Sequence, residues 1–191
     1  MQKRITDIPN IYVEFFSVLI DKKIKDGIKK LLIESDNDFV PSLSSRIVPK
    51  NSNQIITKNE PDITDYYNSI MHQKFIVLYG GNEIIGFTTF VNGVNIKSKI
   101  SGIKENFLCN YYTTAIIDKR YRGLGLGTKI MGYNVPEDYK NKYHVTRTWS
   151  SNQASIYMLY KLGYSIYYRI ENERGEGVDT IFFLKEMPAF E

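Results

Sequence analysis

Residues 121–129 read YRGLGLGTK, with three glycines at alternate positions, an arginine before them, and a threonine and a lysine after them. This much glycine is typical of backbone that turns tightly or lets a ligand approach its amide groups. The β-branched and aromatic residues 110–117 predict a strand before the loop, and residues 128–134 predict a helix that Pro136 stops. A glycine turn between a strand and a helix N-terminus can hold phosphate, because unpaired N–H groups and the helix dipole face the anion.

Spacing distinguishes the known phosphate-binding loops. A P-loop requires G-x-x-x-x-G-K-[ST], but the two residues after Gly127 are a threonine and then a lysine, which is the wrong order. A dinucleotide fingerprint requires G-x-G-x-x-G, whereas Gly123, Gly125 and Gly127 give G-x-G-x-G. The residue about 20 positions further on is Arg147 rather than the acid that binds the ribose. Both interpretations are therefore disfavoured.

The remaining pattern is R-x-x-G-x-G, which Arg122, Gly125 and Gly127 satisfy. Residues 116–127, IIDKRYRGLGLG, resemble the acyl-CoA pyrophosphate loop of the GNAT (Gcn5-related) N-acetyltransferase superfamily. Residues 152–164, NQASIYMLYKLGY, resemble the later helix of that family, in which Asn, a small residue three positions on, and Lys-Leu-Gly-aromatic recur. The resemblance extends over residues 72–186.

The resemblance implies an α/β (α+β) fold in one GNAT-type domain spanning 1–191. It has a mixed central sheet with splayed middle strands and helices on both faces. We expect residues 72–187 to form the CoA-binding core. We expect residues 1–71 to supply a helical N-terminal part and a loop that covers the acceptor.

The resemblance also implies acetyl-CoA as the acyl donor. The amides of Gly123 to Thr128 would hold the pyrophosphate with Arg122 nearby, and the strand ending at Ile117 would lie along the pantetheine. The implied CoA-binding residues are Ile116, Ile117, Arg122, Gly123, Leu124, Gly125, Leu126, Gly127, Thr128, Asn152 and Ser155.

The implied reaction is direct attack of a primary amine on acetyl-CoA in a ternary complex, with a base for the amine proton and an acid for the departing thiolate. Many family members place a tyrosine acid seven residues after the helix asparagine, but that position is Leu159 here. Tyr160 is one residue away, which turns its side chain by about 100° on a helix. The spacing is closer to the branch that includes ribosomal-protein alanine acetyltransferases, in which this tyrosine is not part of the pattern.

The catalytic residues are therefore unassigned. Tyr160, Tyr157, Ser155 and water are the candidates for the acid. A water chain, Glu83 or an acidic residue of the 34–60 loop are the candidates for the base.

Composition limits the class of protein. The chain has 191 residues, 42% of them hydrophobic, which suits one domain with a real core. The chain has a single cysteine, Cys109, which excludes an internal disulfide. Because the only histidines are His72 and His144, we also expect no metal site. We expect Cys109 to be a small buried hydrophobe, with a covalent acyl route left open, and the histidines to have surface or strand-end roles.

Hydropathy and charge indicate the compartment in which we expect the protein and the partners that we expect it to bind. No apolar run approaches the roughly 20 residues that span a bilayer, and the N-terminus lacks a secretory apolar region, so we expect a cytoplasmic protein without membrane partners. The net charge of +4 is spread along the chain. We expect a small-molecule or peptide amine as partner rather than nucleic acid, and a monomer or homodimer. The alternatives are a non-catalytic CoA-binding module and, from the 15 tyrosines and basic charge, an RNA-binding domain.

The remaining elements must position these residues. Apolar residues between 11 and 32 recur at helical spacing and predict an amphipathic helix that Gly27 softens or divides. We expect residues 34–60 to form a long polar loop, with Ser44 to Arg46 as either loop packing or acceptor cover. We expect Trp149 to be either cleft wall or core. The other expected elements are a helix at 63–72, a hairpin of strands 74–79 and 83–92, a strand at 143–149, a helix at 151–161, and strands at 164–170 and 180–187.

Overall fold

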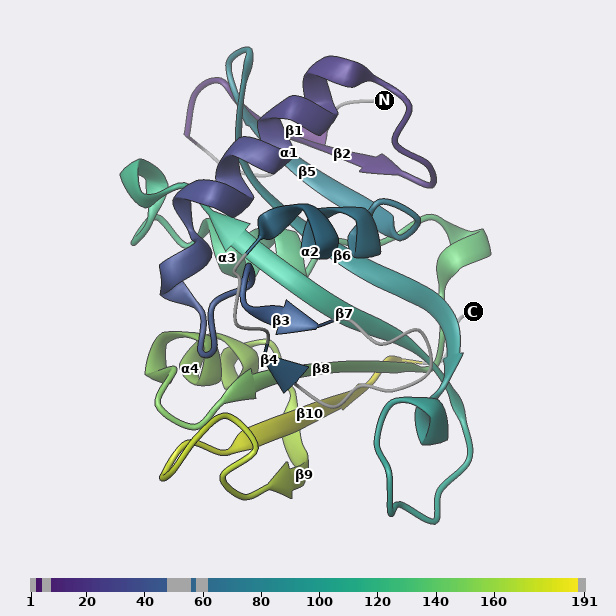
Figure 1. Cartoon of the computed structure of the whole chain (residues 1–191). Helices are drawn as coiled ribbons and strands as arrows, with labels where there is room; N and C mark the ends of the chain where they lie inside the picture. Colours follow the sequence, from purple (N-terminus) through teal and green to yellow (C-terminus); the bar gives the residue numbers. More distant parts are fainter. Residues whose placement is uncertain (1–2, 5–7, 48–55, 58–61, 189–191) are drawn as a thin grey trace.

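The computed structural model describes residues 3–4, 8–47, 56–57 and 62–188. Its main sheet has eight strands in the order β1-β2-β5-β6-β7-β8-β10-β9 (Figure 1). Neighbouring strands are antiparallel except β7 and β8, which are parallel. The strands are β1 (Lys3–Arg4), β2 (Ile11–Phe16), β5 (Lys74–Gly80), β6 (Glu83–Asn95), β7 (Leu108–Ile117), β8 (Tyr143–Trp149), β9 (Ser165–Ile170) and β10 (Thr180–Glu186). A separate pair joins β3 (Arg46–Ile47) to β4 (Ile56–Thr57).

In the described part of the chain, four α-helices cover the two faces of this sheet. They are α1 (Lys22–Glu34), α2 (Ile63–Ile70), α3 (Leu126–Met131) and α4 (Gln153–Lys161). Figure 1 shows α1 and α2 in front of the strands, with α3 behind them. Alternate residues of β5 point to opposite faces: Phe75 and Val77 pack with residues of α1 and α2, while Ile76 and Leu78 pack with residues of α3 and α4. The prediction of an α/β fold with a mixed sheet and helices on both faces is confirmed.

The prediction of one helix over residues 11–32 is wrong in its first half. Residues 11–16 form β2, which pairs antiparallel with β5 and buries Ile11 and Val13 in alternation. Helix α1 begins only at Lys22. Asp21 caps its N-terminus, because the Asp21 carboxylate accepts a hydrogen bond from the amide of Ile24 at 3.0 Å. The N-terminal part is therefore a mixture of strands and helices.

Gly27 does not divide α1, which continues through it. A Cβ at this position would lie 2.7 Å from Cδ1 of Ile84. Glycine therefore lets the helix approach β6 closely.

The later elements largely follow the sequence-based expectations. The predicted hairpin is β5 and β6, the predicted helix at 63–72 is α2, and the last two strands are β9 and β10. Helix α3 begins and ends earlier than expected, because Gly125 in a left-handed conformation precedes Leu126 and Gly132 caps the C-terminus. Part of the expected 34–60 loop, residues 48–55 and 58–60, lies outside the described residues.

The middle strands part halfway along their length. The parallel ladder between β7 and β8 runs from the pair Cys109–Tyr143 to the pair Tyr112–Thr146. Beyond it, β7 stays paired with β6 as far as Ile117, and β8 stays paired with β10. The expected splay of the middle strands is thus present, and it leaves an opening between the far ends of β7 and β8.

We predict that Gly86→Ala destabilises the protein by about 1–3 kcal/mol. Gly86 pairs with Ile117, and a Cβ there would lie 2.8 Å from the carbonyl oxygen of Ile116. Backbone this close can relieve the overlap only by moving the strand. Urea unfolding measures the effect, with Gly27→Ala as comparison because the nearest atoms there belong to the Ile84 side chain. Equal midpoints for Gly86→Ala and wild type would contradict this account.

His144 generates a prediction on acid stability. It was expected in a surface or strand-end role, and it lies near the start of β8 but is buried, with its ring 5.4 Å from that of Tyr112. Burial, with a smaller effect of the Lys185 charge, lowers the pKa of His144 to about 4. The unfolded chain binds the proton more readily, so stability is lost as the pH falls below the usual histidine pKa.

The lowered pKa of His144 should make the free energy of unfolding about 2 kcal/mol smaller at pH 5 than at pH 7. His144→Gln should remove that part of the pH dependence, as measured by denaturant unfolding at both pH values. The same loss between pH 7 and pH 5 in variant and wild type would refute the role of His144.

Candidate active site

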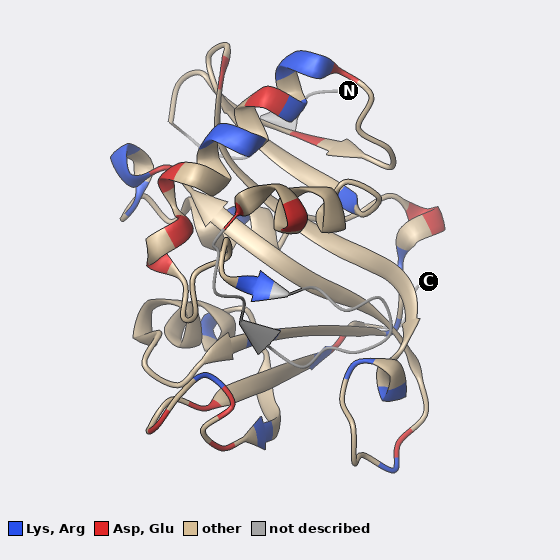
Figure 2. Ribbon diagram, in the orientation of Figure 1, with Lys and Arg blue, Asp and Glu red and all other residues tan. Residues whose placement is uncertain are grey.

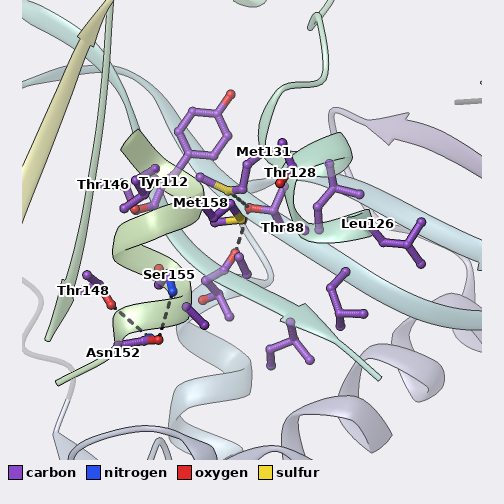
Figure 3. Close-up of a pocket in the computed structure, with 18 of the residues that line it drawn as sticks. Thr88, Tyr112, Leu126, Thr128, Met131, Thr146, Thr148, Asn152, Ser155 and Met158 are labelled. Atoms are coloured by element: carbon purple, nitrogen blue, oxygen red, sulfur yellow. Dashed lines mark hydrogen bonds between the residues drawn. The ribbon is translucent and has the colours of Figure 1, made fainter. Parts of the chain in front are cut away.

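A cavity of about 650 Å³ occupies the opening between β7 and β8. Its walls come from residues 112–117 of β7, the glycine loop and the first turn of α3, residues 146–149 of β8, and one face along the length of α4 (Figure 3). Ser35, Asp38 and Phe39 close one side, so the described start of the 34–60 loop does border the cavity. Ten of the eleven expected CoA-binding residues line it; Leu124 is half-exposed and does not.

The glycine loop has the backbone that its sequence predicts. Gly123 and Gly125 have φ angles of +80° and +72°, a region that other residues rarely adopt. A Cβ at either position would have no atom within 4 Å, so these two glycines are needed for conformation and leave space open beside the loop. The first amides of α3 follow directly and lack acceptors within the helix.

Arg122 ties this loop to the segment after α1. Its Nε donates to the carbonyl oxygen of Ile117 at 3.0 Å, and its Nη2 lies 2.7 Å from Oδ2 of Asp38. Lys119 Nζ lies 3.4 Å from the other carboxylate oxygen. Burial raises the pKa of Asp38, but hydrogen bonds and charge from Arg122 and Lys119 outweigh it, so the pKa lies below its usual value. Asp38 is therefore a paired carboxylate at the edge of the cavity.

Asn152 caps α4 and links it to β8. Its Oδ1 accepts from the amide of Ser155 at 3.1 Å, and its Nδ2 donates to Oγ1 of Thr148 at 3.1 Å (Figure 3). Asn152 and Ser155 both line the cavity, as their spacing of one helical turn predicts.

The candidate catalytic residues are distributed unevenly. Tyr157 lines the cavity with a largely exposed side chain, whereas Tyr160 packs edge-on against Phe183 and does not line it. Leu159 is buried in the core and also lines the cavity. Glu83 lies beside the turn between β5 and β6, 3.2 Å from Arg120, and lines a separate hollow next to α1. The structure does not bring Glu83 or Tyr160 to the cavity.

The floor of the cavity contains residues that the motifs did not single out. Thr88 donates to the carbonyl oxygen of Thr114 at 2.9 Å and also contacts Met131. The Tyr112 hydroxyl is buried without a hydrogen-bond partner among the described residues, and burial raises its pKa. Residues 111–114 read Tyr-Tyr-Thr-Thr, a β-branched and aromatic run that predicts a strand but no role in the site.

Trp149 belongs to the wall of the cavity. Its ring centroid lies 5.8 Å from that of Phe39, which brings the 36–47 segment against the end of β8. Cys109 is buried away from the cavity, and burial raises the pKa of its thiol to about 12 despite the nearby Lys99 charge. Cys109 is thus a small buried residue, as expected.

Among the described residues, no group of three or more His, Cys, Asp or Glu side chains is arranged to hold a metal ion. No helix in the described part of the chain has the length and apolar character needed to cross a membrane.

Comparisons with known proteins agree with this architecture. The yncA protein from Salmonella typhimurium, solved with acetyl-CoA, has a TM-score of 0.62 and 14% identity, covering 95% of this chain and 96% of that one. The ribosomal-protein-S5-alanine acetyltransferase from Vibrio fischeri has a TM-score of 0.60 and 15% identity over 97% and 98% of the two chains. Naa50 from Arabidopsis thaliana, bound to a bisubstrate analogue, has a TM-score of 0.57 and 15% identity over 92% and 99%.

At these identities the solved structures show the fold. No curated protein matches the chain significantly. Residues 44–164, more than half of the chain, match the family model described as "Acetyltransferase (GNAT) family". With the splayed strands and the glycine loop at the head of α3, this match shows that the chain belongs to the GNAT acetyltransferase family.

Proposed function

We propose that the protein transfers the acetyl group of acetyl-CoA to a primary amine by direct attack in a ternary complex. The observation that carries this proposal is the cavity between the parted ends of β7 and β8, with the glycine loop at its edge. Its volume of about 650 Å³ lies within the range of small-molecule sites. The solved relatives that carry acetyl-CoA or CoA, yncA and the ribosomal L7/L12 acetyltransferase RimL, support the choice of donor.

The glycine loop is the proposed pyrophosphate site. The amides from Gly123 to Thr128 would donate to the phosphate oxygens, since the left-handed glycines leave open space beside them. Arg122 and Lys119 add positive charge at the same edge. We assign the CoA-binding core to residues 72–187 and the acceptor cover to residues 1–71, part of which borders the cavity at Asp38 and Phe39.

The open edge of β7 is the proposed site for the pantetheine. From Thr113 to Ile117 this strand is not paired with β8, so its main chain can pair with amide groups of the donor as a neighbouring strand would. A backbone N–H fixed there can stabilise negative charge that develops on the thioester oxygen, an effect worth a few kcal/mol. Asn152 and Ser155 face the same space from α4.

The chemistry requires a neutral amine. Its lone pair attacks the thioester carbonyl carbon, the C–S bond breaks, the amine loses a proton, and the CoA sulfur gains one. Among the described residues that line the cavity, Asp38 is the one carboxylate, and it is paired with Arg122. Water is therefore the proton acceptor that this arrangement favours, and among the candidate acids Tyr157 and Ser155 line the cavity.

The same features favour a second candidate, a CoA-binding module without catalysis. Leu159 fills the position where many relatives place the tyrosine acid, and it packs in the core. Release of free thiol from acetyl-CoA across a panel of primary amines separates the two functions. Turnover of any amine in the panel excludes the non-catalytic module.

Gly125→Asp should lower the affinity for acetyl-CoA by at least about 100-fold, because it places a carboxylate where the phosphates approach a left-handed backbone. Thermal shift with acetyl-CoA measures this: ligand at about 100 times Kd stabilises the wild type by about 2.7 kcal/mol. Gly93→Asp is the matched control, with φ of +64° and open space but a position in β6 away from the cavity.

If Gly125→Asp keeps wild-type affinity, the loop is not the pyrophosphate site. If the wild type itself gains no stability from acetyl-CoA, the donor assignment fails and the RNA-binding alternative gains support.

Cys109→Ala should keep the rate of thiol release within about twofold of wild type, because the thiol is buried outside the cavity and its raised pKa of about 12 suppresses the thiolate. Steady-state kinetics with the best amine of the panel measures the rate, with a thermal melt to confirm folding. Loss of turnover in a folded Cys109→Ala variant would instead indicate transfer through an acyl-cysteine.

A further inference from the structure

A β-bulge interrupts β7 at the point where this strand parts from β8. The last ladder pair between the two strands is Tyr112–Thr146. On its other side, β6 pairs with Tyr112 and next with Thr114, so Thr113 is the extra residue of the bulge. Bulges are common next to active sites, where they re-aim a side chain.

The bulge changes which face of the sheet the following side chains reach. Tyr112 packs with residues of α3 and α4. In an unbroken strand Thr114 and Ile116 would point the same way as Tyr112, since side chains alternate with a period of two. Instead, Ile116 packs with residues of α1 and α2, and the Thr114 hydroxyl contacts α2. The Thr114 side chain thus points away from the face that carries α3 and α4.

Tyr66 of α2 holds the Thr114 hydroxyl in place. The two side-chain oxygens lie 2.8 Å apart, and both residues are buried. A hydroxyl has one proton and two lone pairs, so the Thr114 oxygen keeps at least one lone pair whichever partner donates. Among the described residues, Tyr66 is the one partner of this oxygen. The Thr114 hydroxyl can therefore accept one more hydrogen bond.

Thr114 lies where the proposed donor site meets the rest of the cavity. Its main chain belongs to the unpaired edge of β7, along which the pantetheine is proposed to bind. It lines the cavity together with Phe39 and Ile116, which both pack in the cluster formed by α1 and α2. An amine that enters beside Phe39 would therefore meet Thr114 next to the strand that holds the thioester.

Strand β7 carries no charged side chain. Figure 2 shows it in tan along its length, because residues 108–117 include no Lys, Arg, Asp or Glu. An amine must be neutral to attack, and a carboxylate beside it would favour the ammonium form. A hydroxyl can accept a hydrogen bond from the amine N–H without adding a negative charge.

We propose that the Thr114 hydroxyl, held by Tyr66, accepts a hydrogen bond from the N–H of the attacking amine. The nitrogen lone pair is then directed at the thioester on the adjoining edge of β7, and the amine proton leaves to water. Thr114 is a binding residue for the acceptor, and Tyr66 is a positioning residue that acts through it. This inference rests on the N-acetyltransferase function proposed above.

Valine and serine variants of Thr114 test the hydroxyl. Thr114→Val keeps the shape of the side chain and should lower kcat/KM for the best amine of the panel by about 10-fold, the effect of one hydrogen bond. The Kd for acetyl-CoA, measured by calorimetry, should stay within about twofold of wild type, because the main chain of β7 is unchanged. Thr114→Ser keeps the hydroxyl and should remain within about threefold of the wild-type kcat/KM.

Tyr66→Phe tests the positioning residue. It removes the partner and leaves the Thr114 hydroxyl free to rotate, so kcat/KM for the amine should fall by about threefold, again without a change in the Kd for acetyl-CoA. A merely structural role of the pair would lower the melting temperature without this selective effect on the amine.

Thr89→Val is the matched control. Thr89 is buried on β6, pairs with Thr114 across the ladder, and has its hydroxyl 2.7 Å from that of Thr113, but it does not line the cavity. This variant also loses a buried contact between two hydroxyls, yet its kcat/KM for the amine should stay within about twofold of wild type. Thermal melts confirm that each variant is folded.

Wild-type kcat/KM in folded Thr114→Val would overturn the proposal, and so would an equal loss in Thr89→Val. If Thr114→Val does not fold, Tyr66→Phe decides. A selective fall in kcat/KM for the amine supports the proposal, and an unchanged value overturns it.

The donor and acceptor assignments fail in different ways. A wild type that does not bind acetyl-CoA overturns the proposed function itself. If acetyl-CoA binds but no amine of the panel reacts, calorimetry on CoA-saturated protein compares the binding of benzylamine to wild type and to Thr114→Val. Weaker binding to the variant supports the contact with Thr114, and equal binding or no binding overturns it.

Discussion

The site depends on one constraint, the point at which the parallel ladder between β7 and β8 stops. Only four residue pairs join the strands, from Cys109–Tyr143 to Tyr112–Thr146. Each strand then keeps its outer neighbour, β6 or β10, so neither can turn back to close the gap. In a continuous sheet the main-chain N–H and C=O groups of β7 and β8 would hydrogen-bond each other. Beyond the last pair these groups face the opening, where an extended ligand can hydrogen-bond them as a strand would.

The two sides of the opening are held by different contacts. On the β7 side, Thr88 and Met131 pack beneath the strand and Arg122 joins the glycine loop to Asp38. On the β8 side, Asn152 caps α4 and hydrogen-bonds Thr148. The segment after α1 spans the opening, because Asp38 pairs with Arg122 on the β7 side and Phe39 packs against Trp149 on the β8 side.

Local signals in the sequence were sufficient for the glycine loop, the strands before and after it and helix α4, because left-handed glycines, β-branched runs and an asparagine cap act over a few residues. They failed at 11–16, where apolar residues at helical spacing form β2, since pairing with β5 outweighed the periodicity. The separation of Glu83 from the cavity depends on contacts between distant segments that no local pattern encodes.

At position 159 of α4, a side chain can either pack in the core or supply a hydroxyl group for proton transfer. The side chain at this position points into the core formed by α3, α4 and the sheet, where leucine contributes packing. A tyrosine there would bring a hydroxyl group that needs a partner. In the proposed reaction, proton transfer would be left to water and to hydroxyl groups at the cavity wall, and rate enhancement would come from alignment of the reactants. The unpaired edge of β7 would supply this alignment for the proposed donor.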